Sequence, residues 1–148
     1  EMLELLPVGQ TVLELLEMIQ LDEQVVDRCR ELKEMGFLLA LDDHEFDSVN
    51  SSIYGVIDII KIDILMTGMD ALPEIVRELR KYPVKLLAEK VEDQAMFNLC
   101  KSLGFDLFQG FYMLESGQFY HLSELFRGEL VCFKLTKELF ICPERAIA

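Results

Sequence analysis

The sequence contains no tryptophan, only two histidines and few basic residues, and these shortages limit what the chain can do. Fourteen lysines and arginines stand against 27 aspartates and glutamates, which gives a formal net charge of −13. Tight, non-specific binding to a nucleic-acid backbone requires basic patches, so we expect no nucleic-acid partner. A small phosphorylated ligand remains compatible with this charge, because divalent metals can bridge carboxylates to phosphates.

Paired cysteines, long apolar runs and a leader-like start are also missing. The four cysteines form no CxxC pair, so we expect free thiols in a reducing compartment rather than a thiolate metal site. No run approaches the roughly 18 uncharged apolar residues that a membrane-spanning helix needs. The first ten residues, EMLELLPVGQ, have no positive segment followed by an apolar one, so no signal peptide is evident. These features predict a cytoplasmic chain without a membrane span.

What the sequence does contain is an alternation of two patterns over a length that fits one domain. Short apolar runs predict strands, and amphipathic segments between them predict helices. The strands are expected at 11–17, 37–43, 57–63, 84–90 and 105–110. Helices are expected at 21–36, 48–56, 71–83 and 92–104. Strands that alternate with helices in this way form βα units and a parallel sheet, which predicts an α/β fold.

Polar residues occur at the end of every apolar run. The first run carries Glu14 and Glu17, and the second ends in the adjacent pair Asp42 and Asp43. The remaining runs carry Lys61 and Asp63, then Glu89 with Glu92 just beyond it, and finally Gln109. Because active sites in βα proteins form where parallel strands end, we expect these side chains to converge on one edge of the sheet.

A simpler explanation is that each polar residue only caps the helix that follows its strand. Aspartate and glutamate suit helix N-termini, so a single position is well explained in this way. Lysine and glutamine cap helices poorly, however, and the pattern recurs after five successive runs. A shared site is therefore favoured over an unrelated βα domain in which these residues are caps.

The residue types at this edge suit a hard divalent cation. Carboxylate oxygens from Glu14, Asp42 and Asp43 are the ligands that Mg²⁺ or Mn²⁺ prefers. Two such ions could activate a water and stabilise the leaving oxygen of a phosphodiester. Lys61 would then offset developing negative charge, while Glu89 or Gln109 would orient the water.

The order LELLE, LALDD, KID, AEKVE and QGF resembles the EAL family of cyclic di-GMP phosphodiesterases, over roughly residues 10–115. The resemblance implies a TIM-like barrel that binds or hydrolyses cyclic di-GMP with Mg²⁺ or Mn²⁺. It implies metal ligands at Glu14, Asp42 and Asp43, and catalytic roles for Lys61, Glu89 and Gln109. The supporting residues that it implies are Glu17, Asp63 and Glu92. We therefore expect an EAL-like domain over residues 1–115 and leave residues 116–148 as an unassigned extension.

The sequence also departs from the family pattern. The signature glutamate that names the family and the asparagine ligand of the next strand are expected before residue 1, so the chain corresponds to about the fourth to eighth barrel strands. The glycine-rich loop FGTGYSS of the family is replaced by HEFDSVNSS at residues 44–52, and AEKVE carries Lys90 where the family has glycine. These changes resemble the divergent EAL domains that are fused to HDOD modules in signalling proteins.

Two functions follow from this balance of retained and altered positions. The first is a degenerate, non-catalytic signalling module that acts through protein contacts or residual binding of cyclic di-GMP. The alternative is a metal-dependent phosphodiesterase that hydrolyses cyclic di-GMP to linear pGpG. Five strands cannot close an eight-stranded barrel, so we also expect an open partial barrel with two unpaired edges, or a dimer that covers them.

Overall fold

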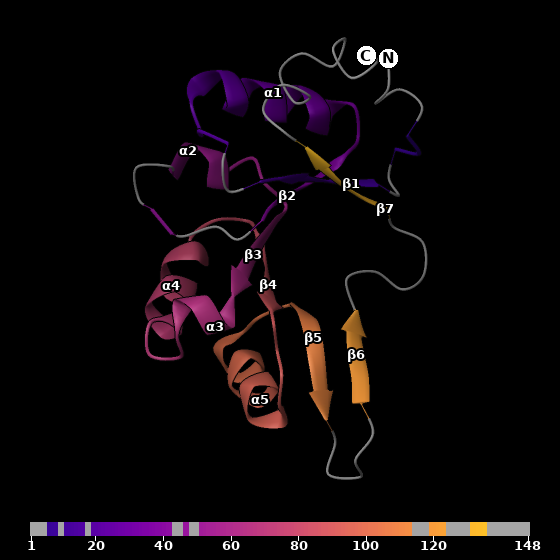
Figure 1. Cartoon of the computed structure of the whole chain (residues 1–148). Helices are drawn as coiled ribbons and strands as arrows, with labels where there is room; N and C mark the ends of the chain where they lie inside the picture. Colours follow the sequence, from indigo (N-terminus) through magenta and orange to yellow (C-terminus); the bar gives the residue numbers. More distant parts are fainter. Residues whose placement is uncertain are drawn as a thin grey trace.

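The chain forms one open, largely parallel sheet with helices packed on one face (Figure 1). This computed structural model describes residues 6–8, 11–16, 19–42, 46–47, 51–113, 119–123 and 131–135, with side chains as far as residue 110. Within these ranges, no helix is long and apolar enough to cross a membrane. The predicted α/β fold with parallel βα repeats is confirmed, and the sheet does not close into a barrel.

Four of the five expected strand regions contain a strand, and the fifth, 105–110, contains the start of a strand that continues to Met113. The five strands are β1 (Thr11–Leu15), β2 (Leu38–Leu41), β3 (Ile59–Asp63), β4 (Lys85–Glu89) and β5 (Leu107–Met113). The helices are α1 (Glu23–Glu34), α2 (Ser51–Tyr54), α3 (Ile64–Thr67), α4 (Leu72–Leu79) and α5 (Gln94–Leu103). Four of these helices fall where the amphipathic segments predict them, whereas the short α3 was not expected. Neighbouring strands from β1 to β5 all pair in parallel.

Two further strands come from the segment that the sequence left unassigned. Strand β6 (Phe119–Ser123) pairs antiparallel with β5, and β7 (Val131–Leu135) pairs parallel with β1. The sheet order is therefore β6-β5-β4-β3-β2-β1-β7. The expectation that β1 and β5 would be unpaired edges is wrong, because each has a partner from this segment. The edges of the described sheet are instead β6 and β7.

Local signals in the sequence explain where the longer helices begin and end. Asp22 accepts a hydrogen bond from the Val25 backbone amide at the start of α1, and Asp93 does the same for Met96 at the start of α5. Such caps satisfy amide groups that have no partner inside the helix. At the end of α5, Gly104 adopts a φ of 95°, a left-handed conformation that glycine reaches without steric cost.

The two faces of the sheet have different cores. Alternate strand residues, such as Leu13, Leu39 and Ile60, face the helices and belong to the large core shared with α1, α4 and α5. The other face carries a small, separate apolar cluster, here called the floor cluster, formed by Val12, Ala40, Ile59 and Leu87. Because side chains alternate along a strand, the next residues on the floor side lie two positions further on.

Candidate functional site

Two positions beyond the floor cluster, the same four strands carry polar side chains. They are Glu14, Asp42, Lys61 and Glu89, here called the rim cluster, and all four residues are buried. Glu14 follows Val12 on β1, Lys61 follows Ile59 on β3, and Glu89 follows Leu87 on β4. Asp42 lies just beyond β2, where its backbone amide donates a 2.9 Å hydrogen bond to the Leu15 carbonyl. The parallel register thus brings these side chains to one edge of the sheet, as the sequence predicts.

The ammonium of Lys61 lies at the centre of the rim cluster. Its Nζ lies 3.3 Å from Glu14 Oε1 and 2.8 Å from Glu89 Oε1, and it donates a hydrogen bond to Asp42 Oδ1. The Lys61 side chain is only 5% exposed. Buried charges are costly unless they are paired, so the three carboxylates and the lysine depend on one another.

The carboxylates determine the charge state of Lys61. Burial acts to lower the pKa of its ammonium, but hydrogen bonds to Asp42 and Glu89, and the charges of Glu89 and Glu14, outweigh burial and raise the pKa above its usual value. Lys61 is therefore a fixed positive charge at neutral pH. It can stabilise negative charge on a ligand, but it cannot serve as a neutral base.

Gln109 lies on the same side of the sheet as the rim cluster. It follows Leu107, which packs against the floor cluster from β5. Its side-chain oxygen, Oε1, is buried and has no hydrogen-bond partner among the described residues. A buried acceptor without a partner is unusual in proteins, and a ligand, a water or a cation would satisfy it.

Asp63 and Glu92 occupy different environments. Asp63 is 4% exposed, follows Lys61 on the same face of β3, and caps α3 by accepting a hydrogen bond from the Met66 amide. Its carboxylate also pairs with the ammonium of Lys90. Burial opposes ionisation of Asp63, but the bonds from Lys90 and from the Met66 amide dominate and lower its pKa. Glu92 is exposed, just before α5.

Lys90 is the site residue whose role the sequence reasoning missed. It has a φ of 58°, the only positive φ at a non-glycine residue in the described part of the chain. The sequence signal was present, because the family pattern has glycine at this position and glycine reaches such a conformation readily. The pattern could not show that the side chain would reach Asp63 on the neighbouring strand.

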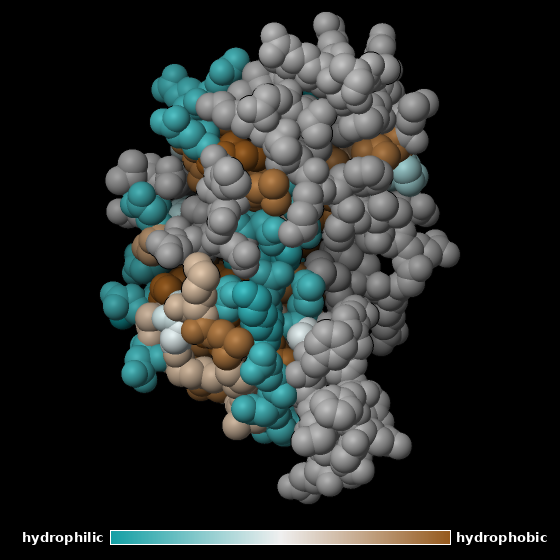
Figure 2. Space-filling model, in the orientation of Figure 1, coloured by the Kyte–Doolittle hydropathy of each residue, from teal (hydrophilic) through white to brown (hydrophobic). Residues whose placement is uncertain are grey.

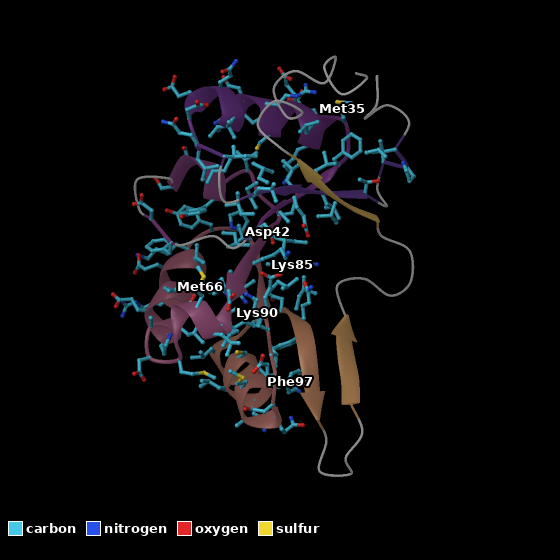
Figure 3. The ribbon with its side chains drawn as sticks, viewed as in Figure 1. Met35, Asp42, Met66, Lys85, Lys90 and Phe97 are labelled. Carbon is cyan, nitrogen blue, oxygen red and sulfur yellow. The ribbon has the colours of Figure 1, made fainter. Side chains whose placement is uncertain are left out.

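The other predicted site residues, Asp43 and Glu17, lie outside the described residues, and so does most of the loop at 44–52. Beside the rim cluster, the short helix α3 directly follows Asp63 and carries two exposed apolar side chains. Leu65 is 46% exposed and Met66 is 62% exposed. Met66 is labelled in Figure 3. Figure 2 shows hydrophilic side chains in a band down the middle of this view of the molecule, with hydrophobic side chains beside it.

The donors present fit a hard divalent cation in their chemistry. Glu14 and Asp42 supply carboxylate oxygens, and the unpartnered Gln109 Oε1 supplies an amide oxygen. In the arrangement found, however, the carboxylates face the Lys61 ammonium. Among the described side chains, no three of histidine, cysteine, aspartate or glutamate are placed so as to hold a metal ion.

A hollow of about 390 Å³ lies elsewhere, between α1 and α2. Its lining includes Glu23, Asp27, Arg30 and Ser52, and it contains none of the rim cluster. The helices that form it pack on the opposite face of the sheet, so we do not assign this hollow to the candidate site.

Comparisons with known proteins agree with the geometry. The chain is 30% identical over 145 residues to the cyclic di-GMP phosphodiesterase CdgJ of Vibrio cholerae, a match that covers 97% of this chain and 30% of CdgJ. It is 37% identical over 113 residues to the uncharacterized protein YuxH of Bacillus subtilis, covering 72% of this chain and 27% of YuxH. The chain therefore spans less than a third of the length of these relatives.

Among solved structures, the chain resembles the Bacillus subtilis YkuI protein, which has an EAL domain and was crystallised in complex with its substrate c-di-GMP and calcium. The TM-score is 0.56 with 26% identity, over 67% of this chain and 26% of that one. The model of the EAL domain matches residues 2–116, which contain the whole rim cluster. The chain belongs to the EAL domain family.

Proposed function

We propose that this chain is a degenerate EAL-type signalling module that binds cyclic di-GMP or a protein partner and does not hydrolyse the nucleotide at a useful rate. The observation that carries the proposal is the rim cluster, in which one buried ammonium lies between three carboxylates at the edge where EAL proteins are expected to receive their ligand. Its residues occupy the family's motif positions. The solved relative YkuI holds c-di-GMP and calcium, which supports the choice of ligand.

The residues of the rim suggest what each would do for a cyclic dinucleotide. Lys61, held charged by its neighbours, would donate hydrogen bonds to a phosphate oxygen. Gln109 would accept a hydrogen bond through its buried Oε1, or hold a water in place. When bound, a Mg²⁺ or Mn²⁺ ion on Glu14, Asp42 and Asp43 would supply an activated water.

Two departures favour binding over hydrolysis. Lys90 stands where the family has glycine and pairs with Asp63, which adds a positive charge at the end of β3, two residues beyond Lys61. The loop at 44–52 has no glycine, so it cannot adopt positive φ cheaply around a metal. Both changes disfavour binding of two metal ions. The alternative function, a cyclic di-GMP phosphodiesterase, depends on that pair of ions.

The protein-contact form of the proposal has its own support. Leu65 and Met66 are exposed large hydrophobic side chains on α3, next to the rim. Exposed apolar side chains that cluster near a ligand site suit a partner or a second copy of the chain. Asp63, which follows Lys61 on the same face of β3, caps α3. Binding of a ligand at the rim would therefore change the position of Leu65 and Met66 through Asp63.

Isothermal titration calorimetry with cyclic di-GMP, with and without Mg²⁺, tests the proposal. We expect binding in the micromolar range, with a loss of at least tenfold in Lys61→Met and no change in the exposed control Lys81→Met. If cyclic di-GMP does not bind, the nucleotide-binding form of the proposal is wrong and only binding of a protein partner is left. Formation of pGpG with excess Mn²⁺ at roughly 1 per second or faster, a rate typical of enzymes, would instead establish the phosphodiesterase.

A further inference from the structure

Lys90 is held in an unfavourable backbone conformation by the strand beside it. A φ of 58° costs a non-glycine residue free energy, so such a residue persists where its surroundings fix it. The next residue, Val91, is fully buried, and its amide donates a 3.1 Å hydrogen bond to the Gln109 carbonyl. Gly110 packs so closely on Val91 that an added Cβ would lie 2.3 Å from the Val91 carbonyl oxygen. The turn after β4 is therefore locked against β5.

This locked turn directs the Lys90 side chain across to β3. Glu89 and Asp63 are register partners on β4 and β3, and Lys90 directly follows Glu89. Its ammonium pairs with Asp63 Oδ2, while the side chain remains 56% exposed. Asp63 lies two residues beyond Lys61 on the same face of β3, which is about 7 Å further along the strand. The ammonium of Lys90 pairs with Asp63 beyond the level of Lys61.

We propose that Lys90 is a built-in counter-cation of the rim, which pairs with Asp63 and thereby lowers the affinity of the site for divalent metal ions. The exposed ammonium of Lys90 adds positive charge next to the rim cluster, and it already pairs with Asp63, the carboxylate that follows Lys61 on the same face of β3. Repulsion between the Lys90 ammonium and a cation held by the rim carboxylates is only partly screened near a protein surface. The inference rests on the proposed function only in taking a divalent cation as the ion that suits the rim.

Mn²⁺ alone, titrated into the chain by calorimetry, tests this role without any measurement of activity. Lys90→Asn and Lys90→Gly remove the charge, and both residues tolerate the left-handed conformation. We expect both variants to bind Mn²⁺ about tenfold more tightly than the wild type, which corresponds to about 1.4 kcal/mol. Lys90→Arg keeps the charge and should bind as the wild type does.

Lys85→Asn is the matched control. Lys85 is an exposed lysine at the opposite end of β4, about 13 Å of strand away from Glu89, so the substitution changes the net charge equally but away from the rim. Its Mn²⁺ affinity should stay within twofold of the wild type. Thermal unfolding of each variant verifies that it is folded.

Several results would overturn the role of Lys90. Equal Mn²⁺ affinity in Lys90→Asn and the wild type would do so, as would an equal gain in Lys85→Asn. A gain in Lys90→Gly alone would assign the effect to backbone freedom rather than charge. Failure of every variant to bind Mn²⁺ would show that Lys90 does not limit metal binding. The nucleotide titration above, made without metal, decides the proposed function separately.

Discussion

The floor cluster and the rim cluster lie on the same face of the same strands, only two residues apart, yet they are opposite in chemistry. The floor consists of four apolar side chains, Val12, Ala40, Ile59 and Leu87, and each is at most 2% exposed. The rim consists of three carboxylates and an ammonium that are almost as buried. Burial therefore does not distinguish the two layers. Their stability has different origins, namely removal of apolar surface from water in the floor and mutual charge compensation in the rim.

The largest loss of stability is expected from a substitution that removes the central charge of the rim cluster. Lys61→Met keeps a side chain of similar length but removes the ammonium that Glu14, Asp42 and Glu89 share. Removing one member of a buried ionic group leaves uncompensated charge, so we expect a loss of about 3–5 kcal/mol in the free energy of unfolding. Urea denaturation at pH 7 measures it. Lys81→Met, on the exposed surface, should change stability by less than about 0.5 kcal/mol.

The matching change in the floor should cost somewhat less. Leu87→Ala removes buried methyl groups from a fully buried position and leaves a cavity, for which we expect a loss of about 2–4 kcal/mol. The same urea experiment measures it. Its effect should not depend on pH between about 5 and 8, because none of the four floor residues is titratable. A strong pH dependence in this range would mean that the floor and rim clusters are coupled rather than separate layers.

Acid should lower the stability of the protein through Asp63, which lies next to the rim cluster on β3. The pKa of Asp63 is lowered in the folded protein, so its contribution to stability is complete above the unfolded value of about 3.8 and is lost as the pH falls through the folded value. We expect the free energy of unfolding to fall less between pH 6 and pH 3 in Asp63→Asn than in the wild type, because the variant has no carboxylate to protonate at this position. Asparagine keeps the cap on α3. Identical acid profiles would contradict this assignment.

Alkali should lower the free energy of unfolding through Cys29, which is buried on the helix-covered face of the sheet. We expect this to be the smallest of the four effects. Cys29 and Cys100 are free and buried. Burial raises the pKa of the Cys29 thiol from its ordinary value to about 12. Its stabilising contribution is complete below about pH 9 and declines as the pH rises toward 12. At pH 10 we expect about 1 kcal/mol of stability to be lost relative to pH 8, and Cys29→Ala to lose less over the same interval. Parallel profiles for the two proteins would show that Cys29 does not titrate on unfolding.

Local pattern was sufficient to predict the five βα strands and the convergence of their polar ends. Runs such as FLLAL are long enough to predict buried strands, and a polar residue stands in or just after the last part of each run. The register of parallel strands then brings Glu14, Asp42, Lys61 and Glu89 together without further information. The sequence could not show that the three carboxylates would share one lysine, because that depends on side-chain distances.

The remaining features depend on partners that are far away in the sequence. Strand β7 pairs with β1 at the other end of the chain, and its sequence VCFKL gives no local sign of that partner. The short helix α3 begins at Ile64, directly after Asp63, which caps it. The sequence predicted Asp63 as a supporting residue at the end of a strand, but not its role as a cap. The roles predicted for the site residues stay predictions, which the titrations above address.

The pairing of β7 with β1 has a consequence for assembly. Both sides of β1 are hydrogen-bonded, to β2 and to β7. Any other strand that docks parallel to β1, from a longer version of this chain or from another molecule, must first displace β7. Completion of a ring of strands at this side would therefore be an exchange reaction rather than a simple addition, and its rate would be limited by how often β7 detaches.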